Sequence, residues 1–336
     1  MQNPTRLSQL PTTRSKIDII YQPIQSELGQ VDQSLRNLGG SESQHIKHLL
    51  GYLFDRGGKG LRPALTLLSS KLFNNKVNHN AVTMATAVEL LHIATLVHDD
   101  TIDDSSIRRG KQTISKRWDS NIAILVGDYV FATSATIVCT TGNLRVVHRF
   151  SETIMELSSG QLMEYLKSHD PTPNREEYLT RIYLKTASLF RTALETGALL
   201  SEAPESALKH LVDYGYNLGM AFQIVDDILD VEATEKEMGK SVGNDLLQGV
   251  LTLPTIIFLE ENPNDDSIAK FFGSKGNPEH LKQIISRIQS SDIIERCYSE
   301  AQRYCYKAKT SLRNFPKSDA LTSLEKLVEF VMERRR

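Results

Sequence analysis

Apolar residues return at helical spacing along most of the chain. Separations of three and four residues bring side chains to one face of an α-helix. Two segments show the pattern, with apolar positions at Leu157, Leu162, Tyr165 and Leu166 in one and at Leu218, Phe222, Val225 and Leu229 in the other. Alternating polar and apolar stretches bounded by Asn-Gly or Asp-Gly, which are typical of β-hairpins, do not occur. The pattern predicts an all-α protein.

Short polar segments separate the predicted helices. They lie at residues 39–43, 73–80, 168–176 and 261–267, and each is short enough to join neighbouring helices of one bundle. None has the character of an interdomain linker. We therefore expect a single helical domain at residues 16–336, after a loose tail at residues 1–15. Segment 232–249 is polar and contains three glycines, which fits either a mobile lid or an ordinary solvated loop.

Composition narrows the functional classes. The chain has 39 basic and 41 acidic residues and a net charge of −2, so it lacks the basic surplus of nucleic-acid-binding domains. Three scattered cysteines, Cys139, Cys297 and Cys305, are too few for a disulfide framework or a zinc-ligand set. The longest apolar run, residues 81–97, is too short and too polar for a membrane span. We expect a soluble cytoplasmic protein that binds no nucleic acid.

Two copies of Asp-Asp-x-x-Asp stand out, at residues 99–103 and 226–230. On a helix, Asp99 and Asp103 share one face, as do Asp226 and Asp230. If these pairs were exposed, each like-charge contact would cost only a few tenths of a kcal/mol, and a solvated acidic face would explain them. However, the preceding residues are those of buried helices, so the carboxylates are expected to open onto an enclosed cavity.

A cation fits such a cavity. Two charges about 6 Å apart at an effective dielectric constant near 20 repel by roughly 3 kcal/mol, which calls for protonation or a counter-cation. Carboxylates without histidine or thiolate neighbours at ligand spacing suit Mg²⁺. Mg²⁺ keeps several waters and binds substrate phosphate oxygens. The sequence therefore predicts a phosphorylated substrate bridged between two helices.

Basic residues follow several glycine or aspartate motifs. They are Lys59 and Arg62 in "GGKGLRP", Arg108 and Arg109 after the first aspartate cluster, Lys185 next to Thr186, and Lys240 in "MGKSVGND". Each alone is an ordinary surface cation. Together with metal-binding aspartates they could hold two diphosphates, one through metal and another directly through arginine and lysine.

The chain resembles the trans-isoprenyl diphosphate synthases, a family of all-helical, chain-elongating prenyltransferases. The resemblance covers roughly residues 20–330. It is carried by six motifs in the family's order, which are "GGKGLRP", "LLHIATLVHDDTIDDSSIRRG", "GDYVFA", "LKTASLF", "GMAFQIVDDILD" and "GKSVGNDLLQG". It implies the isoprenoid synthase fold and the condensation of isopentenyl diphosphate with an allylic diphosphate primer.

The resemblance also implies roles for individual residues. Its two metal motifs fall on Asp99, Asp100, Asp103, Asp226, Asp227 and Asp230, which in the family hold three Mg²⁺ ions. The positions that contact the allylic diphosphate are Arg108, Lys185, Thr186, Gln223 and Lys240. The positions of the isopentenyl diphosphate pocket are Lys59, Arg62, His92 and Arg109. The residues expected to carry catalysis are Asp99, Asp103, Lys185, Asp226 and Lys240.

The product length is predicted from residues before the first aspartates. Helical geometry places Ala94 and Thr95 one turn below Asp99, facing the pocket for the growing chain. In short-chain relatives large aromatic residues form a floor there, whereas both residues here are small. We expect a C30 to C50 product. A floor lower down, at Tyr129 or Phe131, would instead give a C15 to C20 product.

One position departs from the family pattern, since Val250 stands where many relatives have lysine or asparagine. The surrounding "LLQGVLTLP" resembles long-chain enzymes, some of which need a small second subunit. The family is usually homodimeric through apolar helices near the aspartates. We therefore expect a homodimer with transient membrane contact during product release, and a hetero-oligomer remains an alternative.

Three rival functions predict different residues. A class I terpene cyclase would carry an Asn, Ser and Glu second metal motif instead of "DDILD". An HD-type phosphohydrolase, suggested by His98 and Asp99, would need further metal-binding histidines. A non-catalytic subunit of a synthase would be free to lose the paired aspartates, which are intact here.

Overall fold

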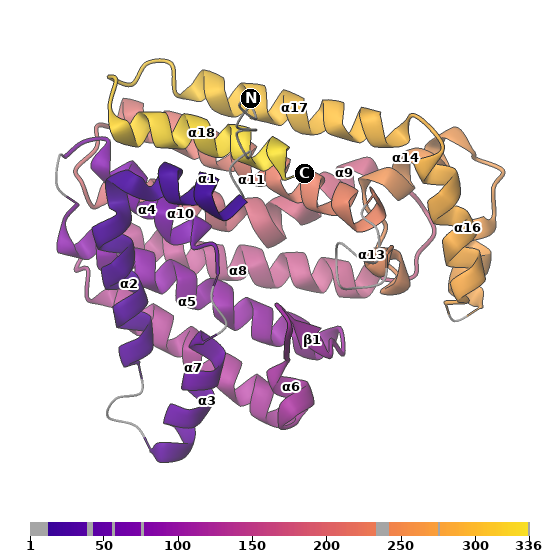
Figure 1. The fold of residues 1–336 in the computed structure, drawn as a ribbon, viewed down its shortest axis with the longest axis horizontal. Helices are drawn as coiled ribbons and strands as arrows, with labels where there is room; N and C mark the ends of the chain where they lie inside the picture. Colours follow the sequence, from indigo (N-terminus) through magenta and orange to yellow (C-terminus); the bar gives the residue numbers. More distant parts are fainter. Residues whose placement is uncertain are drawn as a thin grey trace, which may run out of the picture.

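The computed structural model describes residues 13–38, 43–55, 58–74, 77–232, 242–274 and 276–334 (Figure 1). Its elements in chain order are α1 (Thr13–Tyr21), η1 (Gln22–Ile24), α2 (Gln25–Asn37), α3 (Gln44–Phe54), α4 (Leu61–Lys71), α5 (His79–Ile102), β1 (Ile107–Arg108), β2 (Lys111–Gln112), α6 (Ile114–Arg117), α7 (Ser120–Cys139), α8 (Leu144–Lys167), α9 (Arg175–Ile182), η2 (Tyr183–Ala187), α10 (Ser188–Leu199), α11 (Glu205–Glu232), α13 (Asn244–Leu247), α14 (Leu253–Glu261), α15 (Ser267–Gly273), α16 (Pro278–Gln289), α17 (Ile293–Ser311) and α18 (Asp319–Glu333). The predicted all-α class is confirmed.

Two long helices, α5 and α11, form the centre of the bundle. Helix α5 packs against α4 and α7, and α11 packs against α10 and α17. Helix α5 starts where the Asn78 side chain accepts a 2.8 Å hydrogen bond from the Ala81 N–H, which satisfies one of the unpaired donors of the first turn. Both aspartate clusters lie at the C-terminal ends of these central helices.

A small hairpin after α5 is the exception to the helical pattern. Strands β1 and β2 pair antiparallel, with Ile107 opposite Gln112. The two turn residues, Arg109 and Gly110, both have positive φ, at 52° and 77°, as the two-residue turns that suit β-hairpins require. This hairpin was not predicted, because an arginine occupies the turn position that usually holds asparagine or aspartate.

Helices α5 and α7 are long and apolar enough to cross a membrane, judged by length and composition alone. The apolar run at residues 81–97 belongs to a helix of 24 residues, so the prediction that it is too short for a span was wrong about length. Two-thirds of the apolar window of α5 is buried inside the bundle, compared with one-third of that of α7. Burial identifies α5 as a core helix, whereas α7 keeps an uncovered apolar surface.

The beginning and the end of the described chain lie next to each other. Lys16 of α1 pairs with Glu333 of α18 at 2.8 Å, and Figure 1 shows both ends on the same side of the bundle. Helix α1 begins at Thr13, inside the tail predicted at residues 1–15. The first twelve residues and residues 233–241, half of the segment 232–249 considered as a lid, lie outside the described residues.

Candidate active site

A cavity of about 1190 Å³, which we call the main cavity, opens between the C-terminal halves of α5 and α11. Its charged and polar lining includes Lys59, Arg62, His92, Asp99, Asp103, Arg108, Arg109, Glu164, Arg181, Lys185, Thr186, Gln223, Asp226, Asp227, Asp245 and Arg334. Pockets for a single small ligand have volumes of about 300 to 1000 Å³. The main cavity is therefore large enough for two small substrates.

The first aspartate cluster presents two of its three carboxylates to the main cavity. Asp99 and Asp103 lie on its wall, one helical turn apart. Burial raises the pKa of Asp99 to about 6, although Lys185 works against the shift. Burial also raises the pKa of Asp103. Asp100 points elsewhere, because its buried carboxylate accepts a 2.5 Å hydrogen bond from Nε of Arg108 and holds the hairpin against α5.

The second cluster divides in a similar way. Asp226 lies on the cavity wall and pairs with Nη2 of Arg334 at 2.6 Å. Asp227 also lines the cavity, but its oxygens accept hydrogen bonds from the Tyr178 hydroxyl (2.8 Å) and the Gln223 amide (2.7 Å). Burial raises the pKa of Asp227 to about 7.

Asp230, the last member of the second cluster, does not line the main cavity. Its carboxylate accepts the backbone N–H groups of Asn244 (3.1 Å) and Asp245 (3.0 Å). Asp230 therefore fixes the start of α13 against α11. Its predicted role as a metal ligand, like that of Asp100, stays a prediction.

Lys185 meets the first cluster from the opposite wall. Its ammonium donates to a carboxylate oxygen of Glu164 on α8. Burial alone would lower the pKa of Lys185, but Glu164, Asp99 and Asp103 raise it above the ordinary value. The adjacent Thr186 donates a 2.6 Å hydrogen bond to Gln223. Lys185 and Thr186 thus connect α8 and α11 around a cationic centre.

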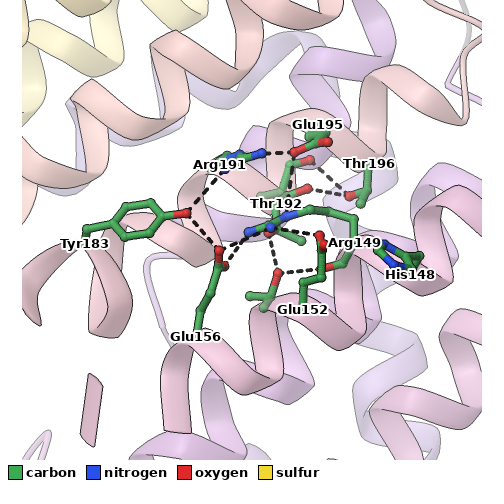
Figure 2. A network of polar contacts seen from close by, with 11 residues as sticks. His148, Arg149, Glu152, Glu156, Tyr183, Arg191, Thr192, Glu195 and Thr196 are labelled. Carbon is green, nitrogen blue, oxygen red and sulfur yellow. Dashed lines mark hydrogen bonds and ion pairs between the residues drawn. The ribbon is translucent and has the colours of Figure 1, made fainter. Parts of the chain in front are cut away.

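The turn that carries Lys185 is a π-helix, η2, a form that often occurs at functional sites. Figure 2 shows the polar network that anchors it, in which Glu156 lies between Tyr183 and Arg149. Arg149 is only 5% exposed and also approaches Glu195 at 3.6 Å. Because the Tyr183 hydroxyl donates to Glu156 at 2.9 Å, the network fixes the start of η2 two residues before Lys185.

A second group of cations lies at the N-terminal side of α4. Nη1 of Arg62 is 3.0 Å from Nε2 of His92. Since a guanidinium can only donate, this histidine nitrogen accepts, and the ring proton lies on the other nitrogen. Burial first, and then Arg62, Arg109 and Arg108, lower the pKa of His92 well below its ordinary value. His92 is therefore neutral and orients Arg62 without adding charge.

Lys59 and Arg109 complete this group on the cavity wall. Burial, followed by the charge of Arg334, lowers the pKa of Lys59. Burial lowers the pKa of Arg62 to about 10, although Glu89 works against the shift. These pKa directions indicate a pocket with excess positive charge, which an anionic ligand would relieve.

Comparison with known proteins identifies the family. The polyprenyl synthetase family model matches residues 43–288. The chain is 35% identical over 323 residues to heptaprenyl diphosphate synthase component 2 of Bacillus subtilis, covering 95% of this chain and 91% of the relative. This chain belongs to the polyprenyl synthetase family.

Solved structures of such synthases agree with the assignment. The heptaprenyl diphosphate synthase of Staphylococcus aureus has a TM-score of 0.88 and 33% identity, with 93% of this chain and 99% of that chain covered. The polyprenyl synthase of Caulobacter crescentus, complexed with calcium and isoprenyl diphosphate, has a TM-score of 0.90 and 30% identity, with 95% and 98% covered. The sequence resemblance, the isoprenoid synthase fold and the prenyltransferase class are confirmed.

The remaining predicted residues of this synthetase lie in different places. Thr95 lines the main cavity, whereas Ala94 is fully buried in the core and is not among the lining residues. Val250, the position that departs from the expected family pattern, lines the cavity. Tyr129 and Phe131 are partly buried on α7 and pack against the core. Lys240 lies outside the described residues.

Sequence reasoning missed several residues on the same wall. Glu164 binds Lys185 from α8, and Asp245 lies next to Asp230. Burial, followed by the nearby Asp230 and Asp227, raises the pKa of Asp245 well above its ordinary value. Glu164 could have been suspected as a carboxylate next to apolar positions of an amphipathic helix. Asp245 carried no such signal, because its contact depends on the fold of the chain after α11.

The carboxylates of the main cavity suit a hard divalent ion that is also coordinated by a bound ligand. Within the described residues, no three His, Cys, Asp or Glu side chains are grouped closely enough to hold a metal. Asp99 and Asp103 of α5 instead line the main cavity together with Asp226 and Asp227 of α11, and burial raises the pKa of Asp99 and of Asp227. Mg²⁺ typically binds one or two carboxylates and completes its shell with water and substrate phosphates. The two walls suit that arrangement.

Proposed function

We propose that this synthetase is a Mg²⁺-dependent all-trans polyprenyl diphosphate synthase that condenses isopentenyl diphosphate with an allylic diphosphate primer. The proposal rests on one observation, which is that a group of carboxylates and a group of cations line the same cavity. Carboxylates on α5 and α11 face each other, and an excess of cations lies beside them at the N-terminus of α4. The first environment suits a metal-bound diphosphate, and the second suits a diphosphate held directly by arginine and lysine.

Cleavage of the allylic C–O bond leaves an allylic cation and a diphosphate that carries the new negative charge. Lys185 and Arg108 are placed on the cavity wall to meet that charge, and fixed cations stabilise the leaving group more in the transition state than in the ground state. Mg²⁺ held by Asp99, Asp103 and Asp226 would supply further positive charge to the same oxygens. Thr186 and Gln223 orient the group through hydrogen bonds.

The second substrate lies beside this cation. Lys59, Arg62 and Arg109 hold its diphosphate, while neutral His92 keeps Arg62 in position. The C=C bond of isopentenyl diphosphate attacks the allylic carbon to form the new C–C bond. A proton then leaves the adjacent carbon, the double bond re-forms, and the departed diphosphate takes the proton, as the family implies. Apolar walls shelter the cation from water.

The product is proposed to be C30 to C50. Three relatives have names that specify long products, heptaprenyl diphosphate synthase component 2 of Bacillus subtilis, solanesyl-diphosphate synthase 2 of Oryza sativa and all-trans-nonaprenyl-diphosphate synthase of Rhodobacter capsulatus. In this chain the small Thr95 lines the cavity below the first aspartates. A short-chain product of C15 to C20 is the alternative.

A homodimer in the cytoplasm is the proposed working form, with transient membrane contact during product release. Large apolar side chains of α7 and α8 are exposed, including Leu125 (67%), Leu162 (61%) and Leu166 (77%). Such an apolar face is typical of a protein interface. The Bacillus subtilis relative is named as one component of an enzyme, so a hetero-oligomer remains the alternative. A non-catalytic role is disfavoured, because both aspartate clusters and both cation groups are intact.

The test is product formation by purified protein with Mg²⁺, labelled isopentenyl diphosphate and primers of 5, 10, 15 and 20 carbons. Asp226→Asn is expected to lower the rate on the order of 100-fold or more, since it removes a charge that serves the leaving group. Asp213→Asn is the matched control, because this aspartate is exposed on the same helix. No product with any primer would overturn the proposal, and products that stop at C20 would overturn the chain length.

A further inference from the structure

A second cavity of about 240 Å³, which we call the side cavity, adjoins the main cavity on the neighbouring face of α5. Its apolar walls are formed by Leu28, Val31 and Leu35 of α2, Leu53 and Phe54 of α3, and Ile93, Leu96 and Val97 of α5. Most of these residues do not line the main cavity. The reaction described above uses no part of this apolar space.

The polar end of the side cavity is the wall that it shares with the main cavity. Tyr21, Lys59, Glu89, Arg108 and Arg109 line both, and Arg108 is paired with Asp100. A ligand in the side cavity would therefore bring an anionic head to Lys59 and Arg109, the two cations assigned above to the isopentenyl diphosphate pocket. The shared wall therefore places an apolar space next to the cations that are proposed to bind a diphosphate.

Tyr21 indicates that this wall is built to bind a ligand. Its side chain is buried, at 7% exposure, and its hydroxyl has no hydrogen-bond partner among the described residues. A buried polar group without a partner has lost the hydrogen bonds that it would make with water, which destabilises the empty site. A hydroxyl that lines both cavities and lacks a partner is positioned to donate to a ligand oxygen.

The carboxylates around the side cavity leave room for an anion. Asp32 pairs with Arg36 at 3.0 Å, and Asp100 pairs with Arg108. Burial raises the pKa of Glu89, although Arg62 works against the shift, so its negative charge is disfavoured. Lys59 and Arg109 both lie on the shared wall, so an anionic head group fits there.

We propose that the side cavity binds the tail of a short prenyl diphosphate whose diphosphate head lies on Lys59 and Arg109. The size argues for a tail of about ten carbons. A 150 Å³ apolar cavity accommodates benzene, a six-carbon ring, and the side cavity is about 1.6 times as large. A longer tail would project beyond its walls.

This mode of binding is unproductive, because the allylic carbon would point away from Asp99 and Asp226. It also excludes isopentenyl diphosphate, which needs the same cations. The expected consequence is inhibition by short primers at high concentration, competitive with isopentenyl diphosphate. The inhibitory role rests on the proposed function, whereas the binding site itself can be tested without catalysis.

The experiment is calorimetric titration of the full chain in EDTA with saturated alkyl diphosphates, which have no allylic bond to ionise. Hexyl, decyl and hexadecyl diphosphate are compared on the unmodified protein, which needs no variant. Affinity is expected to rise at least 10-fold from hexyl to decyl and then to level off. A continued rise to hexadecyl would place the tail in the larger main cavity and overturn the proposal.

Two variants locate the tail. Val31→Phe fills the side cavity and is expected to weaken decyl diphosphate binding at least 10-fold. Thr95→Phe narrows the main cavity only, and is expected to leave that affinity unchanged. The reverse pattern, or no binding of decyl diphosphate to the unmodified protein, would overturn the proposal. A melting curve of each variant checks that it is folded.

Competition and turnover separate this proposal from the proposed function. Isopentenyl diphosphate is expected to displace decyl diphosphate, and independent binding of the two would overturn the shared head site. A chain that binds decyl diphosphate in the expected way but forms no product with Mg²⁺ would contradict only the proposed function. Normal turnover without decyl diphosphate binding would contradict only the side cavity.

Discussion

Replacing Asp99 by asparagine should stabilise the metal-free protein while removing its activity. Burial raises the pKa of this carboxyl from the ordinary 3.8 to about 6, and the nearby Asp103 adds to the shift. Since one pKa unit corresponds to 1.36 kcal/mol, the charged form of Asp99 destabilises the folded state by at most about 3 kcal/mol at neutral pH. The side chain keeps partial exposure to water, so this value is an upper limit.

The sign of the pH dependence follows from the direction of the shift. Because the folded-state pKa of Asp99 lies above its unfolded value, the penalty is complete above about pH 6 and disappears as the pH falls toward 4. An asparagine cannot ionise, so the advantage of the variant should be largest at pH 8 and small at pH 4.5.

The assay is thermal unfolding in EDTA between pH 4.5 and 8. For a chain of 336 residues, the typical unfolding entropy converts 3 kcal/mol into a Tm increase of about 4 °C. Asp104→Asn is the matched control, because this aspartate is exposed and has a left-handed backbone (φ 48°) that asparagine tolerates. A variant that melts below the parent protein at pH 8, or a difference that does not shrink in acid, would refute the reasoning.

Three further results are expected at other contacts. Arg149→Met should lower Tm by about 4 to 7 °C, because it removes the ion pair between Glu156 and a buried guanidinium, which costs about 3 to 5 kcal/mol. Arg145→Met, at an exposed ion pair, should change Tm by about 1 °C or less in the same melting assay. Thr95→Phe should shorten the products seen by chromatography with a farnesyl primer, and unchanged products would contradict its place in the elongation path. Leu162→Asp should shift sedimentation toward the monomer, whereas Tyr306→Asp, at an exposed aromatic residue on α17, should not.

Much of the site could be predicted from the sequence, because its chemistry is local. Asp99 and Asp103 lie one turn apart on one helix, so their common face follows from helical geometry alone. Lys185 and Thr186 are neighbours in the sequence, so their proximity is also known without the fold. The all-α class was equally accessible, since apolar periodicity persists along the chain.

The parts that could not be predicted depend on contacts between distant segments. Glu164 becomes part of the site only because η2 packs against α8. Arg334 reaches Asp226 across 108 positions of sequence. Likewise, periodicity gives Asp230 the same face as Asp226, but the later fold of the chain turns its carboxylate to the backbone of Asn244 and Asp245.

The aspartates of one cluster make different contacts, and this affects how genetic variation at these positions should be interpreted. Substitutions of Asp226 and Asp230 would both score as loss of function in a mutational scan, yet for different reasons. Under the proposed function, the first would remove charge from the reacting groups, and the second would in addition release the backbone that begins α13. Activity alone therefore cannot distinguish a catalytic defect from a folding defect within one aspartate motif. Measuring the amount of folded protein together with its activity would separate the two.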